Sequence, residues 1–328
     1  MIKFFRSTGI GPLLLLTVIT GALWAEYFID PPKILAPAAD TVMPLWNIIL
    51  TFLADSPLAA VFASLSVMLL LVIIIVRFNT TLFFIPRRTY LPALFYIIFY
   101  SVFPGEMVLN PCLPAALFLT IGLWRMMAAY RMNGIAYNLF DAALIISFGG
   151  MFYAGALWFV LLAIIGLLIL RSPDLREITI TLFGALLPWL VLYAVWYLTG
   201  RELSDLTEII GNNLFKESAS VYWSRTLIIL LIVIALWLLQ ALGALLTELP
   251  SKKIRSRKIF TLLLWTMTLS AAVFLLVPAV SVELMVLAAM PLAYVMSNYS
   301  AFTKRVATTE IFFWLIAVMI VISRLWPY

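Results

Sequence analysis

The chain has 328 residues, of which 65% are hydrophobic and only 11% are charged. Soluble domains carry about a quarter charged residues, so this composition excludes an ordinary water-soluble fold and makes lipid the solvent for much of the surface. Histidine is absent and Cys112 is the single cysteine, which excludes an intrachain disulfide, zinc-protease motifs, histidine-ligated iron and Ser-His-Asp catalysis. The net charge of +6 does not indicate nucleic acid binding, because the basic residues lie in short pieces between apolar segments.

Apolar runs long enough to cross a bilayer recur along the whole chain and predict an all-α, polytopic transmembrane bundle of about eleven helices. The predicted spans are 9–27, 57–76, 90–103, 112–128, 138–153, 155–170, 178–199, 226–246, 259–277, 281–297 and 309–323. Gly149 and Gly150 predict either a tight hairpin or a broken helix between the fifth and sixth spans. The first span resembles a signal peptide, but Leu23 is a poor residue before a cleavage site at Ala25, so we expect an uncleaved anchor.

The lysines and arginines divide unevenly between the two sides when the spans alternate. Cytoplasmic loops carry an excess of these residues, so the N-terminus is predicted in the cytoplasm and the C-terminus outside. Sixteen fall inside: Lys3, Arg6, Arg77, Arg87, Arg88, Arg125, Arg131, Arg171, Arg176, Lys252, Lys253, Arg255, Arg257, Lys258, Lys304 and Arg305. Five fall outside: Lys33, Arg201, Lys216, Arg225 and Arg324. Ten carboxylates fall outside: Glu26, Asp30, Asp40, Asp55, Glu106, Glu202, Asp205, Glu208, Glu217 and Glu283.

We predict a single integral membrane domain over residues 1–328, since no polar stretch is long enough for a separate soluble domain. Leu45–Ala54 predicts a short interfacial helix in the first outer loop, and Glu202–Leu214 predicts an amphipathic helix in the second. The connections that stand out are the first outer loop 28–56, the second long outer loop 200–225 and the basic cytoplasmic linker 247–258.

Candidate catalytic groups lie at the outer end of the first span. Glu26 and Asp30 are four residues apart, so both carboxylates share one face if the helix continues that far. Such a pair is suited to bind a divalent cation or to act as a general base. The alternative is that both carboxylates are simply solvated. No other metal site is predicted.

The outer cations are candidates for lipid-phosphate binding. Arg201, Lys216 and Arg225 flank or lie in the second long loop, where they are suited to neutralise a phosphate; the alternative is ordinary interfacial anchoring. At the predicted inner face, Arg125 and Asp141 are interpreted as a structural pair, with an inner gate or head-group contact as the alternative.

Two resemblances add to these patterns. The segments 85–105, 117–127, 138–153, 183–200 and 287–299 resemble an uncharacterised multi-pass inner-membrane family of Bacteroidota, over about two thirds of the chain. They include IPRRTYLPALFYIIFYSVFPG and NLFDAALIISFGGMFY, which are helix-end and packing signatures and imply no chemistry.

The second resemblance is architectural. A helix that runs into the stretch from Glu26 to Asp30, followed by Pro44–Leu50 and then Asp55, is similar to the polytopic glycosyltransferases that use polyprenyl-phosphate sugars. This resemblance implies that Glu26 or Asp30 is the base and that Arg201 or Arg225 holds the phosphate. The chain departs from that superfamily because its paired-acid motif is not clean and no large outer soluble domain follows.

Three functions therefore stay open. The first is sugar transfer from a polyprenyl-phosphate lipid at the outer face of a bacterial inner membrane. The second is a transporter or flippase for a lipid or solute, which requires a cavity through the bundle centre. The third is a non-catalytic subunit or scaffold with a membrane protein partner. The bilayer is a partner in every case.

Overall fold

The protein is seen in a computed structural model that describes residues 1–32, 42–53, 55–130, 135–170, 174–216 and 223–325. This part of the chain contains helices and no strand. The α-helices are α1 Ile2–Phe5, α2 Ile10–Ile29, α3 Pro44–Leu53, α4 Pro57–Leu82, α5 Leu91–Tyr100, α6 Cys112–Ala128, α7 Ile135–Gly149, α8 Leu161–Leu170, α9 Leu175–Leu198, α10 Leu203–Phe215, α11 Arg225–Glu248, α12 Ile254–Leu276, α13 Met285–Phe302 and α14 Val306–Leu325. Short 3-10 helices are η2 Pro104–Glu106, η3 Ala154–Val160, η4 Leu249–Ser251 and η5 Val282–Leu284.

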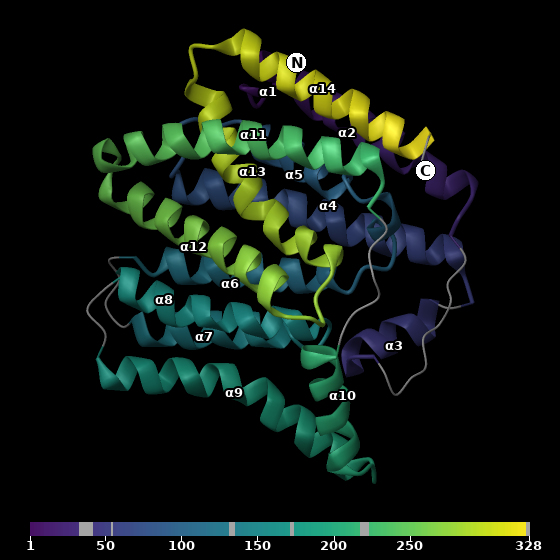
Figure 1. Ribbon diagram of the computed structural model, residues 1–328. Helices are drawn as coiled ribbons and strands as arrows, with labels where there is room; N and C mark the ends of the chain where they lie inside the picture. Colours follow the sequence, from purple (N-terminus) through teal and green to yellow (C-terminus); the bar gives the residue numbers. More distant parts are fainter. Residues whose placement is uncertain (33–41, 54, 131–134, 171–173, 217–222, 326–328) are drawn as a thin grey trace.

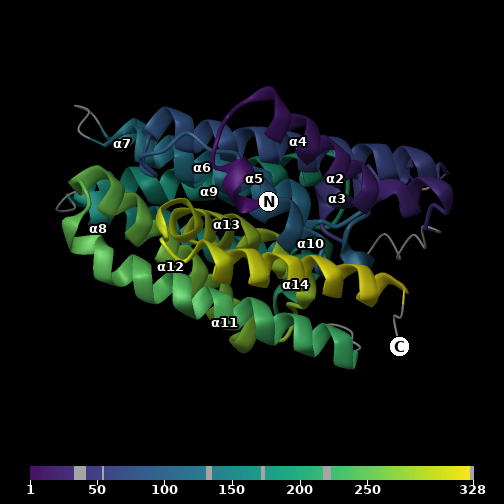
Figure 2. The same cartoon turned by 90° about the horizontal axis from the view of Figure 1, so that it is seen from above.

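The centre of the bundle is formed by α5 and α13, which pack on each other. Every residue of α5 is buried. In the span Val282–Phe302, which is η5 followed by α13, 83% of an 18-residue apolar stretch is also buried. Figure 2 shows α4 and α11 on opposite sides of this pair. Tyr294 of α13 donates a hydrogen bond to the carbonyl of Ile75 on α4 at 2.7 Å. The centre is thus a packed core of aromatic and aliphatic side chains.

The outer helices expose apolar faces, as expected of helices that lie against lipid. In an 18-residue apolar stretch of α9, only 17% is buried. The corresponding share is 22% in α2 and 22% in α14. Among the described residues, seven helices are long and apolar enough to cross a membrane: α2, α4, α9, α11 with η4, α12, α13 with η5, and α14. A multi-pass membrane protein is therefore confirmed. Each of the other four predicted spans contains a shorter helix, so the number of crossings stays a prediction, as does the sidedness of the termini.

One end of the bundle gathers cations that the sequence predicts to be cytoplasmic, and we call it the basic end. Arg6 donates to the carbonyls of Ser300 and Thr303 at 2.9 and 3.2 Å. Arg87 donates to the carbonyl of Ala301 at 3.0 Å. These carbonyls form the C-terminus of α13, where the helix dipole favours positive charge. Lys252 adds a hydrogen bond to the Asn298 side chain at 3.0 Å.

The structure can be compared with two of the predicted connections. The basic linker 247–258 is wrong in extent, because α11 continues to Glu248 and α12 already begins at Ile254. Lys258 can lie in the first turns of a membrane helix because its ammonium donates to the carbonyl of Leu170 at 2.7 Å and lies 5.3 Å from the centre of the Tyr130 ring. At Gly149 and Gly150 the hairpin alternative holds: α7 ends at Gly149, and η3 and α8 pack back against it.

Candidate functional site

The opposite end of the bundle carries two short helices that run across the direction of the long ones, α3 and α10, and we call it the groove end (Figure 1). Both helices are amphipathic. Trp46 and Leu50 of α3 and Ile209 of α10 are buried in a small hydrophobic cluster with Ala154. The backbone amide of Leu45 also donates to the carbonyl of Met151 at 3.3 Å. The apolar faces therefore fix α3 and α10 to the bundle and leave their other faces open.

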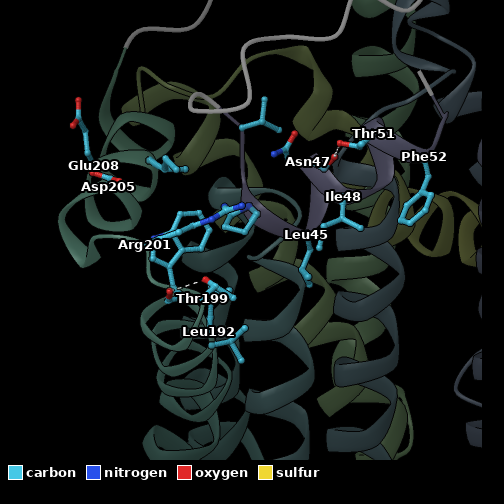
Figure 3. Close-up of a pocket in the computed structure, with 15 residues that line it drawn as sticks. Leu45, Asn47, Ile48, Thr51, Phe52, Leu192, Thr199, Arg201, Asp205 and Glu208 are labelled. Atoms are coloured by element: carbon cyan, nitrogen blue, oxygen red, sulfur yellow. Dashed lines mark hydrogen bonds between the residues drawn. The ribbon is translucent and has the colours of Figure 1, made fainter. Parts of the chain in front are cut away.

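A groove of about 1010 Å³ lies between α3, α10 and the C-terminal end of α9. Figure 3 shows residues of its α3 and α9 walls facing one another. Its lining combines apolar and polar side chains from the two predicted outer loops and from the end of the predicted span 178–199: Val42, Pro44, Leu45, Asn47, Ile48, Thr51, Phe52, Leu192, Val195, Trp196, Thr199, Arg201, Asp205, Glu208 and Ile209. Mixed lining of this kind suits an amphipathic molecule.

Arg201 is positioned in this groove by the way in which α9 ends. Gly200 has φ +74°, in the left-handed region that glycine occupies without strain. The amide of Gly200 donates to Tyr197 at 3.0 Å and that of Arg201 to Trp196 at 3.4 Å, which is the hydrogen-bond pattern of a Schellman motif. The chain turns back sharply, and the Arg201 guanidinium carbon lies 4.7 Å from the centre of the Trp196 ring.

The charges that line the groove are not neutralised by one another. Arg201 is the one cation in the described lining, and Asp205 and Glu208 are the two carboxylates. None of the three forms an ion pair within the described part of the chain. Asp205 accepts one long hydrogen bond, from the Ser204 hydroxyl at 3.5 Å. The groove therefore presents a guanidinium on an aromatic ring and two carboxylates to whatever enters it.

The predicted catalytic pair lies elsewhere. The helix does continue to Ile29, and the amide of Asp30 donates to the carbonyl of Glu26 at 2.9 Å. Both side chains are exposed, and neither lines the groove. Glu26 lies 3.8 Å from Arg324 near the end of α14. Glu26 therefore has a cation from its own chain as a neighbour. Among the described residues, no group of three or more Cys, Asp or Glu side chains gathers to hold a metal ion.

Arg324 is largely buried and ties several segments together at the groove end. It donates to the carbonyl of Leu23 and to the Met107 sulfur, and its guanidinium carbon lies 5.7 Å from the centre of the Tyr27 ring. Tyr27 in turn donates to the carbonyl of Pro104 at 2.8 Å. Glu26 therefore lies where α2 contacts α14, a position that the sequence alone did not indicate.

The remaining predicted residues divide into two groups. Lys216 directly follows α10 and Arg225 begins α11; both are exposed and neither lines the groove. Of the three predicted phosphate-binding cations, only Arg201 lies in the groove. Arg125 and Asp141 do form the predicted pair: two guanidinium nitrogens donate to one carboxylate oxygen at 3.0 and 2.8 Å.

A partly buried carboxyl group, Glu106, lies outside the groove. Glu106 ends η2, and Asn110 donates to its side chain at 3.2 Å. Burial raises the pKa of the Glu106 carboxyl above its ordinary value of 4.5. Glu106 does not line the groove, so we interpret it as part of the packing between η2 and α6.

Sequence reasoning missed most of the groove. Asp205 and Glu208 were predicted only as outer carboxylates, and Trp196 and Asn47 were not singled out. A signal for Arg201 did exist, because Thr199-Gly200-Arg201 after an apolar helix is a typical helix C-terminus. The opposing wall on α3 has no such signal, since its position depends on how the short helix packs.

The chain belongs to a family of unknown function, DUF6427, which matches residues 41–326. This match includes α3, α9 and α10 and therefore all of the groove. No curated protein and no solved structure shows a significant match.

Proposed function

We propose that this multi-pass membrane protein binds an amphipathic lipid in the groove between α3, α9 and α10, and that Arg201 contacts the phosphate of the lipid. The observation that carries this proposal is an arginine that has no ion pair in the described part of the chain and is stacked on Trp196 beside an apolar wall. Guanidinium groups bind phosphate oxygens with two parallel N–H donors. Stacking on Trp196 holds this donor pair at the groove.

The apolar wall accounts for the rest of such a ligand. Leu192 and Val195 of α9 and Ile48 and Phe52 of α3 line the groove, and Phe52 is 82% exposed. Large exposed apolar side chains beside a polar site are typical of surfaces that contact lipid or a partner. In the proposed complex, the acyl chains cover these four side chains while the headgroup lies toward Arg201.

A direct test compares Arg201→Gln with Arg225→Gln in delipidated, detergent-purified protein. Arg225 is a matched control, because it is an exposed cation near the same end and does not line the groove. Binding of a short-chain phospholipid, followed by native mass spectrometry, should weaken about tenfold or more in Arg201→Gln, since hydrogen bonds to charged groups are worth about 1.5–3 kcal/mol when well placed and about 1.4 kcal/mol is a factor of ten. Equal binding by both variants would contradict the proposal.

Sugar transfer from a polyprenyl-phosphate donor at the outer face of an inner membrane is a narrower proposal for the same groove. The observation that favours it is that the groove joins the two predicted outer loops and holds Arg201 for the phosphate. Its predicted base, Glu26 or Asp30, does not line the groove, so lipid binding is the better supported function. Unchanged cell-surface glycans after Glu26→Gln plus Asp30→Asn would count against transfer.

The bundle centre argues against transport through the middle of the protein. A transporter requires a cavity between the helices that line its route. The completely buried α5 and the buried α13 fill that region with side chains, among them Tyr294 and Phe95. A non-catalytic role beside a membrane protein partner is compatible with lipid binding at the groove.

A further inference from the structure

We infer that the lipid bound in the groove carries a primary ammonium group as well as its phosphate. This inference rests on the proposed function, because it concerns the headgroup of the same ligand. It starts from the charges of the groove, where one guanidinium is accompanied by two carboxylates. A phosphate site that served anions alone would not be expected to keep two further negative charges beside it.

The two carboxylates are arranged to act together. Asp205 and Glu208 are three residues apart on α10 and therefore share one face of that helix. Both are exposed, and neither has a cationic partner in the described part of the chain. Figure 3 shows them on α10, across the groove from Asn47 and Thr51 of α3. The lining thus combines two carboxylates on α10 with the guanidinium of Arg201, which follows α9.

Electrostatics selects between headgroups in this setting. Charges a few ångströms apart at a protein surface interact appreciably, although salt screens them. A lipid whose headgroup carries only a phosphate would be attracted to Arg201 and repelled by Asp205 and Glu208. An ammonium group linked to the phosphate would remove that repulsion and would donate up to three N–H bonds to the carboxylates.

The apolar part of the lining identifies the source as a lipid and not a soluble zwitterion. Ile48, Phe52, Leu192 and Val195 would stay exposed to water if a small soluble molecule occupied only the polar part. Burial of acyl chains against these side chains stabilises a complex by roughly 25 cal/mol per Å² of apolar surface. We therefore expect a phosphoethanolamine-type headgroup on a diacyl lipid.

The test compares short-chain phosphatidylethanolamine with phosphatidylglycerol of the same acyl chains, using delipidated full-length protein. The two lipids share the phosphate and differ in the amine. Wild-type protein should bind phosphatidylethanolamine about fivefold more tightly, the scale of exposed ion pairs. Asp205→Asn plus Glu208→Gln should reduce this preference to about one. Soluble phosphoethanolamine should compete only at concentrations at least roughly tenfold higher.

Glu202→Gln provides the matched control, because Glu202 is an exposed carboxylate of the same loop that does not line the groove. It should keep the wild-type preference. Equal or tighter binding of phosphatidylglycerol to the wild-type protein would overturn the ammonium inference and leave the phosphate proposal intact. Competition by soluble phosphoethanolamine at the same concentration as the lipid would overturn the lipid part. If neither lipid depends on Arg201, the proposed function itself is wrong.

Discussion

The basic end and the groove use their charges in opposite ways. At the basic end, Arg6, Arg87, Lys252 and Lys258 each donate to a carbonyl or amide oxygen of the protein. At the groove end, Arg201 and the carboxylates beside it have no ionic partner within the described residues. A charge that is already satisfied by the fold stabilises it, whereas a charge left open beside a groove is available to a ligand. This difference directs the search for function to the groove end.

The largest effect should come from removing the cations that cap α13. Arg6→Ala plus Arg87→Ala leaves the carbonyls of Ser300, Ala301 and Thr303 without these donors. We expect a loss of roughly 3 kcal/mol in the free energy of unfolding, if each of the two partly exposed arginines contributes about 1.5 kcal/mol, the lower value for hydrogen bonds from charged groups. Denaturant unfolding in detergent measures it. The control is Arg88→Ala, an exposed neighbour that has no such bond to the described residues; an equal loss there would contradict the contrast between the basic end and the groove.

A second prediction concerns the attachment of α9, the helix that carries the groove. A Cβ atom at Gly184 would lie 2.5 Å from the carbonyl oxygen of Phe140 on α7, so Gly184→Ala must push the two helices apart. Overpacking of this kind costs about 1–3 kcal/mol. Thermal unfolding should report the loss. Gly243→Ala on α11 has open space and should be close to neutral; similar losses in both variants would refute the close packing of α9 on α7.

A smaller effect is expected at the turn that places Arg201. Gly200→Ala puts a side chain at φ +74°, which costs about 1 kcal/mol. Because the strain acts on the turn that directs Arg201, phospholipid binding should weaken as well. Gly211→Ala in α10 meets open space and is the matched control. If binding falls equally in both variants, the turn does not position the guanidinium.

The smallest effect should be a change in pH dependence at Glu106. Its pKa is raised by burial, so the folded protein keeps this proton to a higher pH than the unfolded chain does. The contribution of Glu106 to stability is therefore greatest below about pH 4.5 and is lost as the pH rises through the raised pKa. The Tm of Glu106→Gln, relative to the Tm of the wild-type protein, should therefore increase as the pH rises, by on the order of 2 °C. A difference in Tm that is constant between pH 5 and pH 8 would contradict this.

The helices themselves were largely predictable, because hydropathy depends on local sequence. The amphipathic helix predicted at Glu202–Leu214 is α10, Leu203–Phe215, and the one predicted at Leu45–Ala54 is α3, Pro44–Leu53. The groove was not predictable, because it depends on which faces of these helices pack against η3 and α9. Glu26 shows the same limit. Its cation neighbour, Arg324, lies at the other end of the chain, and no local pattern links them.

The cap on α13 has a consequence for synthesis. Arg6, Arg87 and Lys252 come from three separate parts of the chain, and all three precede α13. Because the chain is synthesised from its N-terminus, the three cations that bond to α13 are already present when α13 is made. A chain that stops before residue 285 would lack the α13 acceptors of all three cations and would leave Lys252 only its ion pair with Glu248. Cells would therefore be expected to degrade truncated products of this kind rapidly.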